Sequence, residues 1–195
     1  MPFVGLTGGL GAGKSTALAA LERLGAATIS TDAIVHELYA DDEVLAAVTG
    51  RWGPEVAPEG VVDRSAIARR AFASPEERAW LEGLLWPLVG RRVAEWRRAA
   101  ESREPRPRAA VVETPLLFEA GLEAGYDATI AVIAEEGVRA ARAAARGHHA
   151  VDERSARQLS QEEKAARATY VVTNSGTVEE LEAELSAVLD KLDPK

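Results

Sequence analysis

Residues 3–16 read FVGLTGGLGAGKST, and this stretch decides the fold class. Residues 3–7 form a short, mostly apolar run that is typical of a buried strand and leads directly into glycines. From Lys14 onward, apolar residues recur at three- and four-residue spacing, which predicts a helix that ends at Gly25. Residues 8–15 therefore lie between a strand and a helix, and they match the pattern G-x-x-x-x-G-K-[ST].

This pattern is that of a loop that binds the phosphates of ATP. Its glycines let several backbone N–H groups point inward, and the following helix adds unsatisfied N–H groups and the positive end of its dipole. We expect Lys14 to reach the β- and γ-phosphates and the Ser15 hydroxyl to bind Mg²⁺. The other expected ATP contacts are Gly9, Gly11, Ala12, Gly13 and Thr16. A glycine-rich turn that merely joins strand to helix is the simpler alternative, but the complete motif in this context argues against it.

The rest of the chain predicts an α/β protein with a helical middle. Further strands are expected at residues 26–30, 109–113, 128–133 and 170–173, and the opening strand–helix–strand–helix order favours a parallel sheet. The middle of the chain predicts only short amphipathic helices, at residues 42–51, 64–72, 75–85 and 88–102. We interpret this stretch as a helical lobe inserted into the sheet domain. Later helices are expected at residues 136–146, from Asp152, and at 178–192.

Composition limits the class of protein. With 195 residues the chain can form one sizeable core, and its net charge of −8 argues against a general nucleic-acid or membrane-surface binder. The absence of cysteine excludes disulfides and thiolate metal sites. No secretory signal and no apolar run of about 18 residues are present, so we expect a cytoplasmic enzyme without a membrane span. We further expect a monomer or a weak homo-oligomer.

Among proteins with such a phosphate loop, small-molecule kinases fit best. A GTPase would be expected to carry an N-K-x-D segment, which is absent. The chain is short for a motor, and it lacks the basic surface of a nucleic-acid translocase.

Four blocks of sequence together resemble the dephospho-CoA kinase family. They are GLTGGLGAGKST at residues 5–16, ISTDAI at 29–34, ETPLLFE at 113–119, and a block from Gln158 to Gly176 that contains EEK, YVV and NSG. The resemblance implies transfer of the ATP γ-phosphoryl group to the ribose 3′-hydroxyl of dephospho-CoA, with Mg²⁺, as the last step of coenzyme A synthesis.

The resemblance also implies the architecture. It predicts a three-layer P-loop fold with a five-stranded parallel sheet, an inserted helical lobe that binds the acceptor, and a helical lid. The single domain would then have its core at about residues 1–40, 105–135 and 168–195, its acceptor lobe at about 41–104 and its lid at about 136–160.

Asp32 and a set of arginines are the candidates for the chemistry. Asp32 follows a strand and opens a helix, at the sheet edge where ligands bind in open α/β folds. A carboxylate there can orient the acceptor hydroxyl and accept its proton. The alternative is an acid that only stabilises the start of the helix.

One predicted helix face carries three arginines, Arg139, Arg142 and Arg146. The resemblance assigns Arg142 and Arg146 to a lid that stabilises charge on the transferred phosphoryl group; a solvated basic stripe is the alternative.

The remaining candidates concern the metal, the adenine and the acceptor. Glu113 ends the third strand, where it either contacts Mg²⁺ through water or is simply an acid at a strand end. By resemblance, Asn174 and Gly176 cradle adenine. Trp86 occupies a position at which the family usually has histidine, so we expect it to replace that contact by stacking or by shape. The expected wall of the acceptor pocket comprises Pro115, Leu116 and Leu117.

Two other functions are compatible with the phosphate loop. A nucleoside monophosphate kinase would be expected to place an arginine cluster in its helical lobe, for which Arg69, Arg70, Arg91 and Arg92 are available. A nucleotide-binding regulatory module would bind ATP without transferring phosphate to an acceptor.

Overall fold

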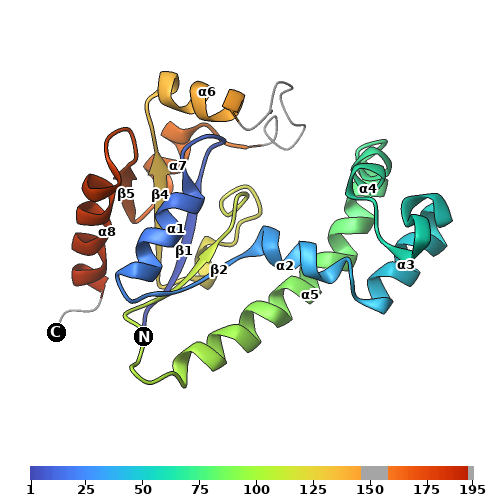
Figure 1. The fold of residues 1–195 in the computed structure, drawn as a ribbon, viewed down its shortest axis with the longest axis horizontal. Coiled ribbons are helices and arrows are strands. Elements are labelled where there is room, and N and C mark those ends of the chain that lie inside the picture. The colour runs from blue at the N-terminus through green and yellow to red at the C-terminus, as the bar shows by residue number, and fades with distance from the viewer. Residues whose placement is uncertain (146–157, 193–195) are drawn as a thin grey trace. The chain divides into compact units, whose positions relative to one another are not determined.

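The computed structural model describes residues 1–145 and 158–192 (Figure 1). The chain divides into two compact units, one made of Met1–Ser30 and Arg97–Lys195 and the other of Thr31–Trp96. The first unit contains all the described strands, and the second is helical. The predicted division into core, acceptor lobe and lid stays a prediction.

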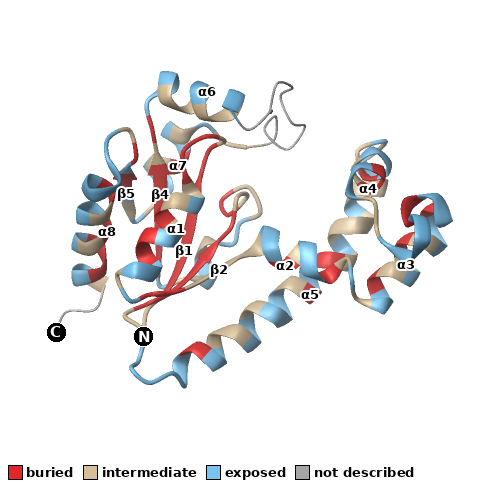
Figure 2. Cartoon of the chain, in the orientation of Figure 1, coloured by how far each residue is buried: buried red, intermediate tan, exposed pale blue. Residues whose placement is uncertain are grey.

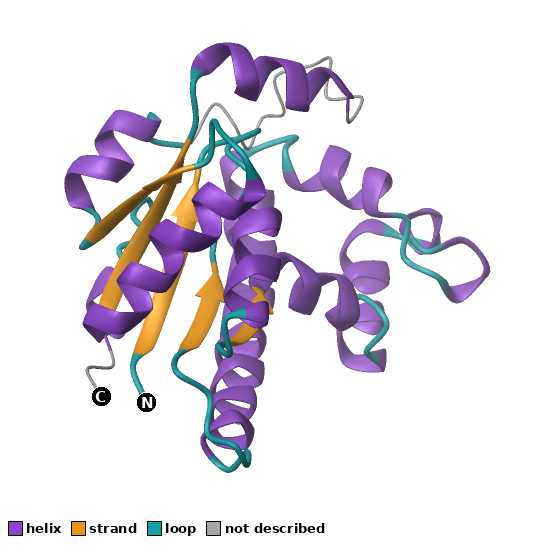
Figure 3. Ribbon diagram, turned by 60° about the vertical axis from the view of Figure 1, so that its left-hand side comes forward, coloured by secondary structure: helices purple, strands orange, loops and turns teal. Residues whose placement is uncertain are grey.

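A five-stranded parallel sheet organises the first unit. Its strands are β1 (Phe3–Gly8), β2 (Ala27–Ser30), β3 (Ala110–Glu113), β4 (Ala128–Ile133) and β5 (Tyr170–Thr173). They lie in the order β2-β3-β1-β4-β5, and every neighbouring pair is parallel, as the arrows of Figure 3 show. The predicted parallel α/β sheet is thereby confirmed.

Helices cover the sheet on both faces. The helices of this unit are α1 (Lys14–Arg23), α6 (Glu136–Ala145), α7 (Gln161–Arg167) and α8 (Val178–Leu192), with a 3-10 turn at Glu123–Gly125. Alternate residues of the strands, such as Val4 and Leu6 of β1, join α1 and α8 in one apolar core. Thr7 follows Leu6 and so points to the opposite face of the sheet, where Lys164 of α7 contacts it. The central strands β1, β3 and β4 are buried almost throughout (Figure 2), as expected for a parallel sheet covered on both faces.

The second unit consists of short helices and most of one long helix. It contains α2 (Thr31–Leu38), α3 (Asp42–Trp52), 3-10 turns at Pro54–Val56 and Pro58–Gly60, α4 (Arg64–Ala71) and α5 (Pro75–Glu101), which enters the first unit at Arg97. Trp52 and Trp80 pack edge to face at 4.9 Å between ring centroids. Glu77 accepts hydrogen bonds from Arg51 and from the Trp52 indole, so α3 and α5 are joined by polar and aromatic contacts.

The long helix α5 differs from the prediction, which broke it at Pro87 into two helices. Proline lacks the N–H that would bond to the carbonyl four residues earlier, which costs about 3 kcal/mol in a helix interior. Leu85 and Leu88 flank Pro87 and are both buried. Each buried leucine contributes about 1.5–3 kcal/mol, which is enough to offset the missing hydrogen bond.

The other helix predictions stand as follows. The helix at 178–192 is confirmed with the same bounds, and residues 31–109 contain no strand, as predicted for the middle of the chain. The start of the helix predicted from Asp152 lies outside the described residues, and α7 begins at Gln161. No helix in the described part of the chain is both long enough and apolar enough to cross a membrane.

Candidate active site

The phosphate loop connects β1 to α1 and depends on its glycines. Gly11 and Gly13 adopt left-handed backbone angles, with φ of 75° and 89°. A Cβ on Gly11 would lie 2.5 Å from the carbonyl oxygen of Arg139, and one on Gly13 would collide with the Asn174 side chain. Both positions therefore require glycine for conformation and for space. Gly13 is the residue before the first turn of α1, so the loop delivers the chain directly to a helix N-terminus.

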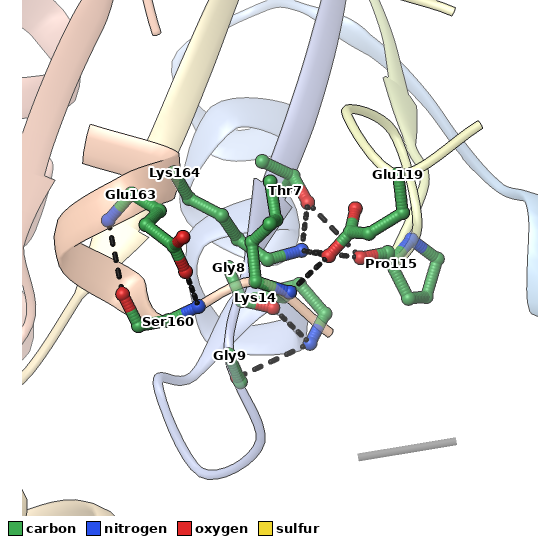
Figure 4. Close-up of polar contacts among 10 residues, drawn as sticks. Thr7, Gly8, Gly9, Lys14, Pro115, Glu119, Ser160, Glu163 and Lys164 are labelled. Atoms are coloured by element: carbon green, nitrogen blue, oxygen red, sulfur yellow. Dashed lines mark hydrogen bonds and ion pairs between the residues drawn. The ribbon is translucent and has the colours of Figure 1, made fainter. Parts of the chain in front are cut away.

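The side chains expected to contact phosphate lie at the start of α1. Lys14 is its first residue, and its ammonium donates to the carbonyl oxygens of Gly8 at 3.0 Å and Gly9 at 3.4 Å (Figure 4). The cation is thus held over the loop. Ser15 and Thr16 follow in the first turn, with Ser15 exposed and Thr16 partly exposed.

Arg139 of α6 supports the phosphate loop through a hydrogen bond to its backbone. Its Nε donates to the carbonyl oxygen of Leu10 at 3.1 Å, and its guanidinium forms an ion pair with Glu136 at 2.8 Å. A Cβ on Gly9 would lie 3.3 Å from the same guanidinium. Sequence reasoning grouped Arg139 with the lid arginines and missed this contact with the loop backbone, because its partner is a carbonyl 129 residues away.

Asn174 ties the loop to the end of β5. Its buried side chain donates from Nδ2 to the carbonyl oxygen of Ala12 at 2.9 Å, and its own carbonyl oxygen accepts from Arg142 at 2.8 Å. The amide of Asn174 supports the phosphate loop. The adenine contacts predicted for Asn174 and for Gly176, which is exposed, stay predictions. Arg142 is held on the same segment, and Arg146, the second predicted lid arginine, lies outside the described residues.

We expect Asn174→Ala to weaken ATP binding about tenfold and to lower the free energy of unfolding by about 1–3 kcal/mol, since the Ala12 carbonyl loses its buried partner. Titration with ATP and thermal unfolding measure the two effects. Thr173→Ala is the control, because Thr173 is exposed and its bond to Glu184 runs through the backbone N–H. Wild-type affinity in Asn174→Ala would contradict this role.

Glu113 and Ser15 are the predicted metal contacts, and they differ in exposure. Glu113 is 7% exposed and accepts a hydrogen bond from the Ser30 hydroxyl at 2.5 Å, where β2 and β3 end side by side. Among residues 1–145 and 158–192, no cluster of three or more His, Asp or Glu side chains surrounds a common point. Mg²⁺ is commonly held by only one or two side chains together with phosphates and water, so the metal contacts expected of Ser15 and Glu113 do not need such a cluster and stay predictions.

Residues 114–119, which we call the post-β3 segment, contain the predicted acceptor wall. Pro115 and Leu116 are partly exposed, whereas Leu117 is fully buried and would collide with any Cβ on Gly5 of β1. Leu117 therefore packs the post-β3 segment against the sheet, and it does not line an exposed pocket wall. The carbonyl oxygen of Pro115 accepts hydrogen bonds from Lys164 at 2.7 Å and from Thr7 at 3.3 Å.

Lys164 is a functional candidate that sequence reasoning missed. It is fully buried and forms an ion pair with Glu119 at 2.9 Å. Burial lowers the pKa of the Lys164 ammonium, and the hydrogen bond and charge of Glu119 act in the opposite direction. The available signal was the lysine in the motif EEK, one of four lysines in the chain.

Asp32 and Trp86 belong to the other unit. Asp32 is the second residue of α2 and is exposed, and Trp86 lies on α5 with 51% of its surface exposed. The sites predicted for them stay predictions. Three of the four arginines that would favour a monophosphate kinase pair with acids: Arg92 with Asp41, Arg69 with Asp63 and Arg70 with Glu55.

Comparison with known proteins identifies the family. The family model for dephospho-CoA kinase matches residues 2–180. The dephospho-CoA kinase of Deinococcus radiodurans is 40% identical over 97% of this chain and 92% of its own length, and that of Chlorobaculum tepidum is 38% identical over 97% and 94%. The crystal structure of TT1252 from Thermus thermophilus superimposes with a TM-score of 0.81 at 36% identity, covering 98% of both chains. A dephospho-CoA kinase from Campylobacter jejuni shares the fold, with a TM-score of 0.64 at 22% identity over 100% of this chain and 98% of its own. The chain belongs to the dephospho-CoA kinase family.

Proposed function

We propose that the residues described above carry out ATP-dependent phosphorylation of the ribose 3′-hydroxyl of dephospho-CoA, which yields coenzyme A and ADP. Membership of the family supports this reaction, the last step of coenzyme A biosynthesis, with ATP and dephospho-CoA as its substrates. The single observation that carries the ATP half is the phosphate loop, in which Gly13 leads into α1 and Lys14 is held over the loop carbonyls.

In this reaction a bond forms between the 3′-oxygen and the γ-phosphorus while the bond from that phosphorus to the β,γ-bridging oxygen breaks. Negative charge spreads over the transferred group and onto the leaving ADP. Lys14 and the N-terminus of α1 supply positive charge and N–H donors to the phosphates. Arg142, with Arg146 beyond the described residues, would add positive charge as α6 closes over the nucleotide.

Asp32 is the proposed base. Its carboxylate would orient the 3′-hydroxyl and accept the proton as the oxygen–phosphorus bond forms. The support is chain order, since Asp32 follows β2 by two residues and ligands of open α/β sheets bind beyond the carboxyl ends of the strands. Asp32 is also exposed, so an acceptor hydroxyl can reach its carboxylate.

Mg²⁺ would be held by the Ser15 hydroxyl and, through water, by Glu113. When bound, it supplies positive charge that neutralises the ATP phosphates. The remaining proposed contacts are with adenine, from Asn174 and Gly176, and with the acceptor, from the post-β3 segment and Trp86. These proposed contacts come from all three predicted parts of the domain: the phosphate loop and post-β3 segment from the core, Trp86 from the acceptor lobe and Arg142 from the lid. A cytoplasmic location also remains our expectation.

A coupled assay of ADP release tests the proposal. We expect release to depend on dephospho-CoA, to be absent with AMP or without an acceptor, and to disappear when EDTA removes Mg²⁺. Mass spectrometry of the product checks that one phosphate has been added to the acceptor. Release stimulated by AMP but not by dephospho-CoA would overturn the assignment, and ATP binding without any acceptor-dependent release would favour a regulatory module.

A further inference from the structure

The first unit contains a fully buried ammonium that the proposed chemistry does not use. Lys164 lies in α7, a helix of seven residues whose start is fixed by reciprocal hydrogen bonds between Ser160 and Glu163. This capping box fixes the residue at which the helix begins. The Lys164 side chain points from the helix toward the post-β3 segment (Figure 4).

All three N–H donors of Lys164 have acceptors, and these come from two other parts of the unit. Its Nζ donates to Thr7 Oγ1 at 3.3 Å, to the Pro115 carbonyl at 2.7 Å and to Glu119 Oε1 at 2.9 Å. Thr7 immediately precedes Gly8, the first glycine of the phosphate loop. Lys164 therefore connects α7, the end of β1 and both ends of the post-β3 segment.

Glu119 extends the connection to a fourth piece of chain. Its Oε1 also accepts the backbone N–H of Leu159 at 2.8 Å, just before α7. Its Oε2 is buried and has no hydrogen-bond partner in the described part of the chain. The negative charge of Glu119 is therefore compensated mainly by Lys164, whose removal would leave a largely buried carboxylate unpaired.

Stability alone is a poor explanation for this pair. A buried ion pair can often be replaced by apolar side chains at no loss of stability, because both charges must be desolvated. What an apolar residue cannot do is fix the direction of the Pro115 carbonyl or the position of Glu119 relative to Thr7. The useful property of the ammonium is its set of three directed hydrogen bonds.

We infer that Lys164 and Glu119 form a positioning pair that holds the post-β3 segment in register against the base of the phosphate loop, and so sets the acceptor relative to the γ-phosphate. This inference rests on the proposed function, because it takes Pro115 and Leu116, the partly exposed residues of the predicted acceptor wall, as the acceptor side. Displacement of one reactant by about 1 Å can lower the rate about 100-fold, so a modest shift of this segment would matter.

A comparison of single and double variants separates positioning from stability. We expect Lys164→Met alone to lower the Tm by about 10 °C, since it leaves Glu119 unpaired, and the double variant with Glu119→Gln to regain most of this loss. In the double variant, KM for dephospho-CoA should nevertheless rise about tenfold and kcat should fall about tenfold, while KM for ATP changes less than about threefold. Recovery of wild-type acceptor kinetics together with stability would overturn the inference.

The matched control removes an exposed ion pair of the same unit. Arg23 and Glu182 join α1 to α8, and Arg23→Met with Glu182→Gln should leave both Tm and kinetics near wild type. A loss of acceptor affinity in this control equal to that in the double variant would show that removing any ion pair has this effect, and would overturn the inference.

Hydrogen exchange provides a readout that does not depend on the acceptor. The amides of Ala120 and Leu122 bond to the carbonyls of Leu116 and Leu117, so they report on the order of the post-β3 segment. In the double variant we expect these amides to exchange at least about tenfold faster, with α8 unchanged. Unchanged exchange would overturn the positioning role. Failure of the wild-type protein to phosphorylate dephospho-CoA would instead overturn the proposed function and leave the exchange result to decide the positioning.

Discussion

Asp32→Asn should lower kcat by about 10²- to 10⁴-fold, the range that a general base contributes, while the affinity for ATP stays within about threefold of wild type. Asparagine is nearly isosteric with aspartate but cannot take up the proton of the 3′-hydroxyl. Because Asp32 is exposed in the first turn of α2, the substitution removes little packing. Steady-state kinetics with dephospho-CoA and an independent titration with ATP measure the two quantities.

Asp42→Asn is the matched control for this variant. Asp42 is also exposed and also lies in the first turn of a helix of the second unit, α3. Both substitutions should remove only about 0.3–1 kcal/mol of favourable interaction with a helix dipole. If Asp32 were no more than an acid at a helix start, the two variants would have equal, nearly normal turnover.

Lys14→Met should lower kcat/KM by about 10²- to 10³-fold, as expected for the loss of a preorganised charge at the transferred phosphoryl group. The fold should tolerate the change, because the Lys14 ammonium donates to the Gly8 and Gly9 carbonyls, which belong to the phosphate loop and not to the apolar core. A positive charge at a helix N-terminus is also unfavourable to the helix, so we expect Tm to stay the same or rise slightly.

Lys191→Met controls for the loss of a lysine at a helix terminus. Lys191 is exposed in the last turn of α8, where its ammonium lies 6.0 Å from the centre of the Tyr170 ring. Its kinetics should match wild type. Turnover of Lys14→Met within about threefold of wild type would remove Lys14 from the mechanism, and a collapse in Tm would mean that its main role is structural.

Local sequence predicted the backbone of the nucleotide site well. The requirement for left-handed angles at Gly11 and Gly13, the strand before them and the helix from Lys14 are consequences of short-range sterics and apolar spacing, and the structure contains all of them. The strand positions and α8 were predictable for the same reason, since periodicity records which face of an element is buried. Local rules failed at Pro87, where burial of the neighbouring leucines offsets the missing hydrogen bond.

The side chains that support the phosphate loop through hydrogen bonds were not predictable in this way. Asn174 reads as an adenine contact by resemblance, yet its amide bonds to Ala12, 162 residues earlier. Arg139 reads as one of three arginines on a helix face, yet its side chain donates to the loop carbonyl of Leu10. In both cases the acceptor is a backbone carbonyl, which every residue carries, so the sequence contains no mark of the partner.

The sequence by itself determined that a phosphate loop follows the first strand and that the sheet is parallel, because both depend on residues close together in the chain. It also indicated the dephospho-CoA kinase family, through four short blocks that can each be recognised without knowing the fold. Only the tertiary structure decided that the strands lie in the order β2-β3-β1-β4-β5 and that Lys164 meets Thr7 and Glu119 beneath the loop. Strand order and buried ion pairs depend on which distant segments come together when the core closes. No spacing along the chain encodes that choice, since it is made by the packing of all the elements at once.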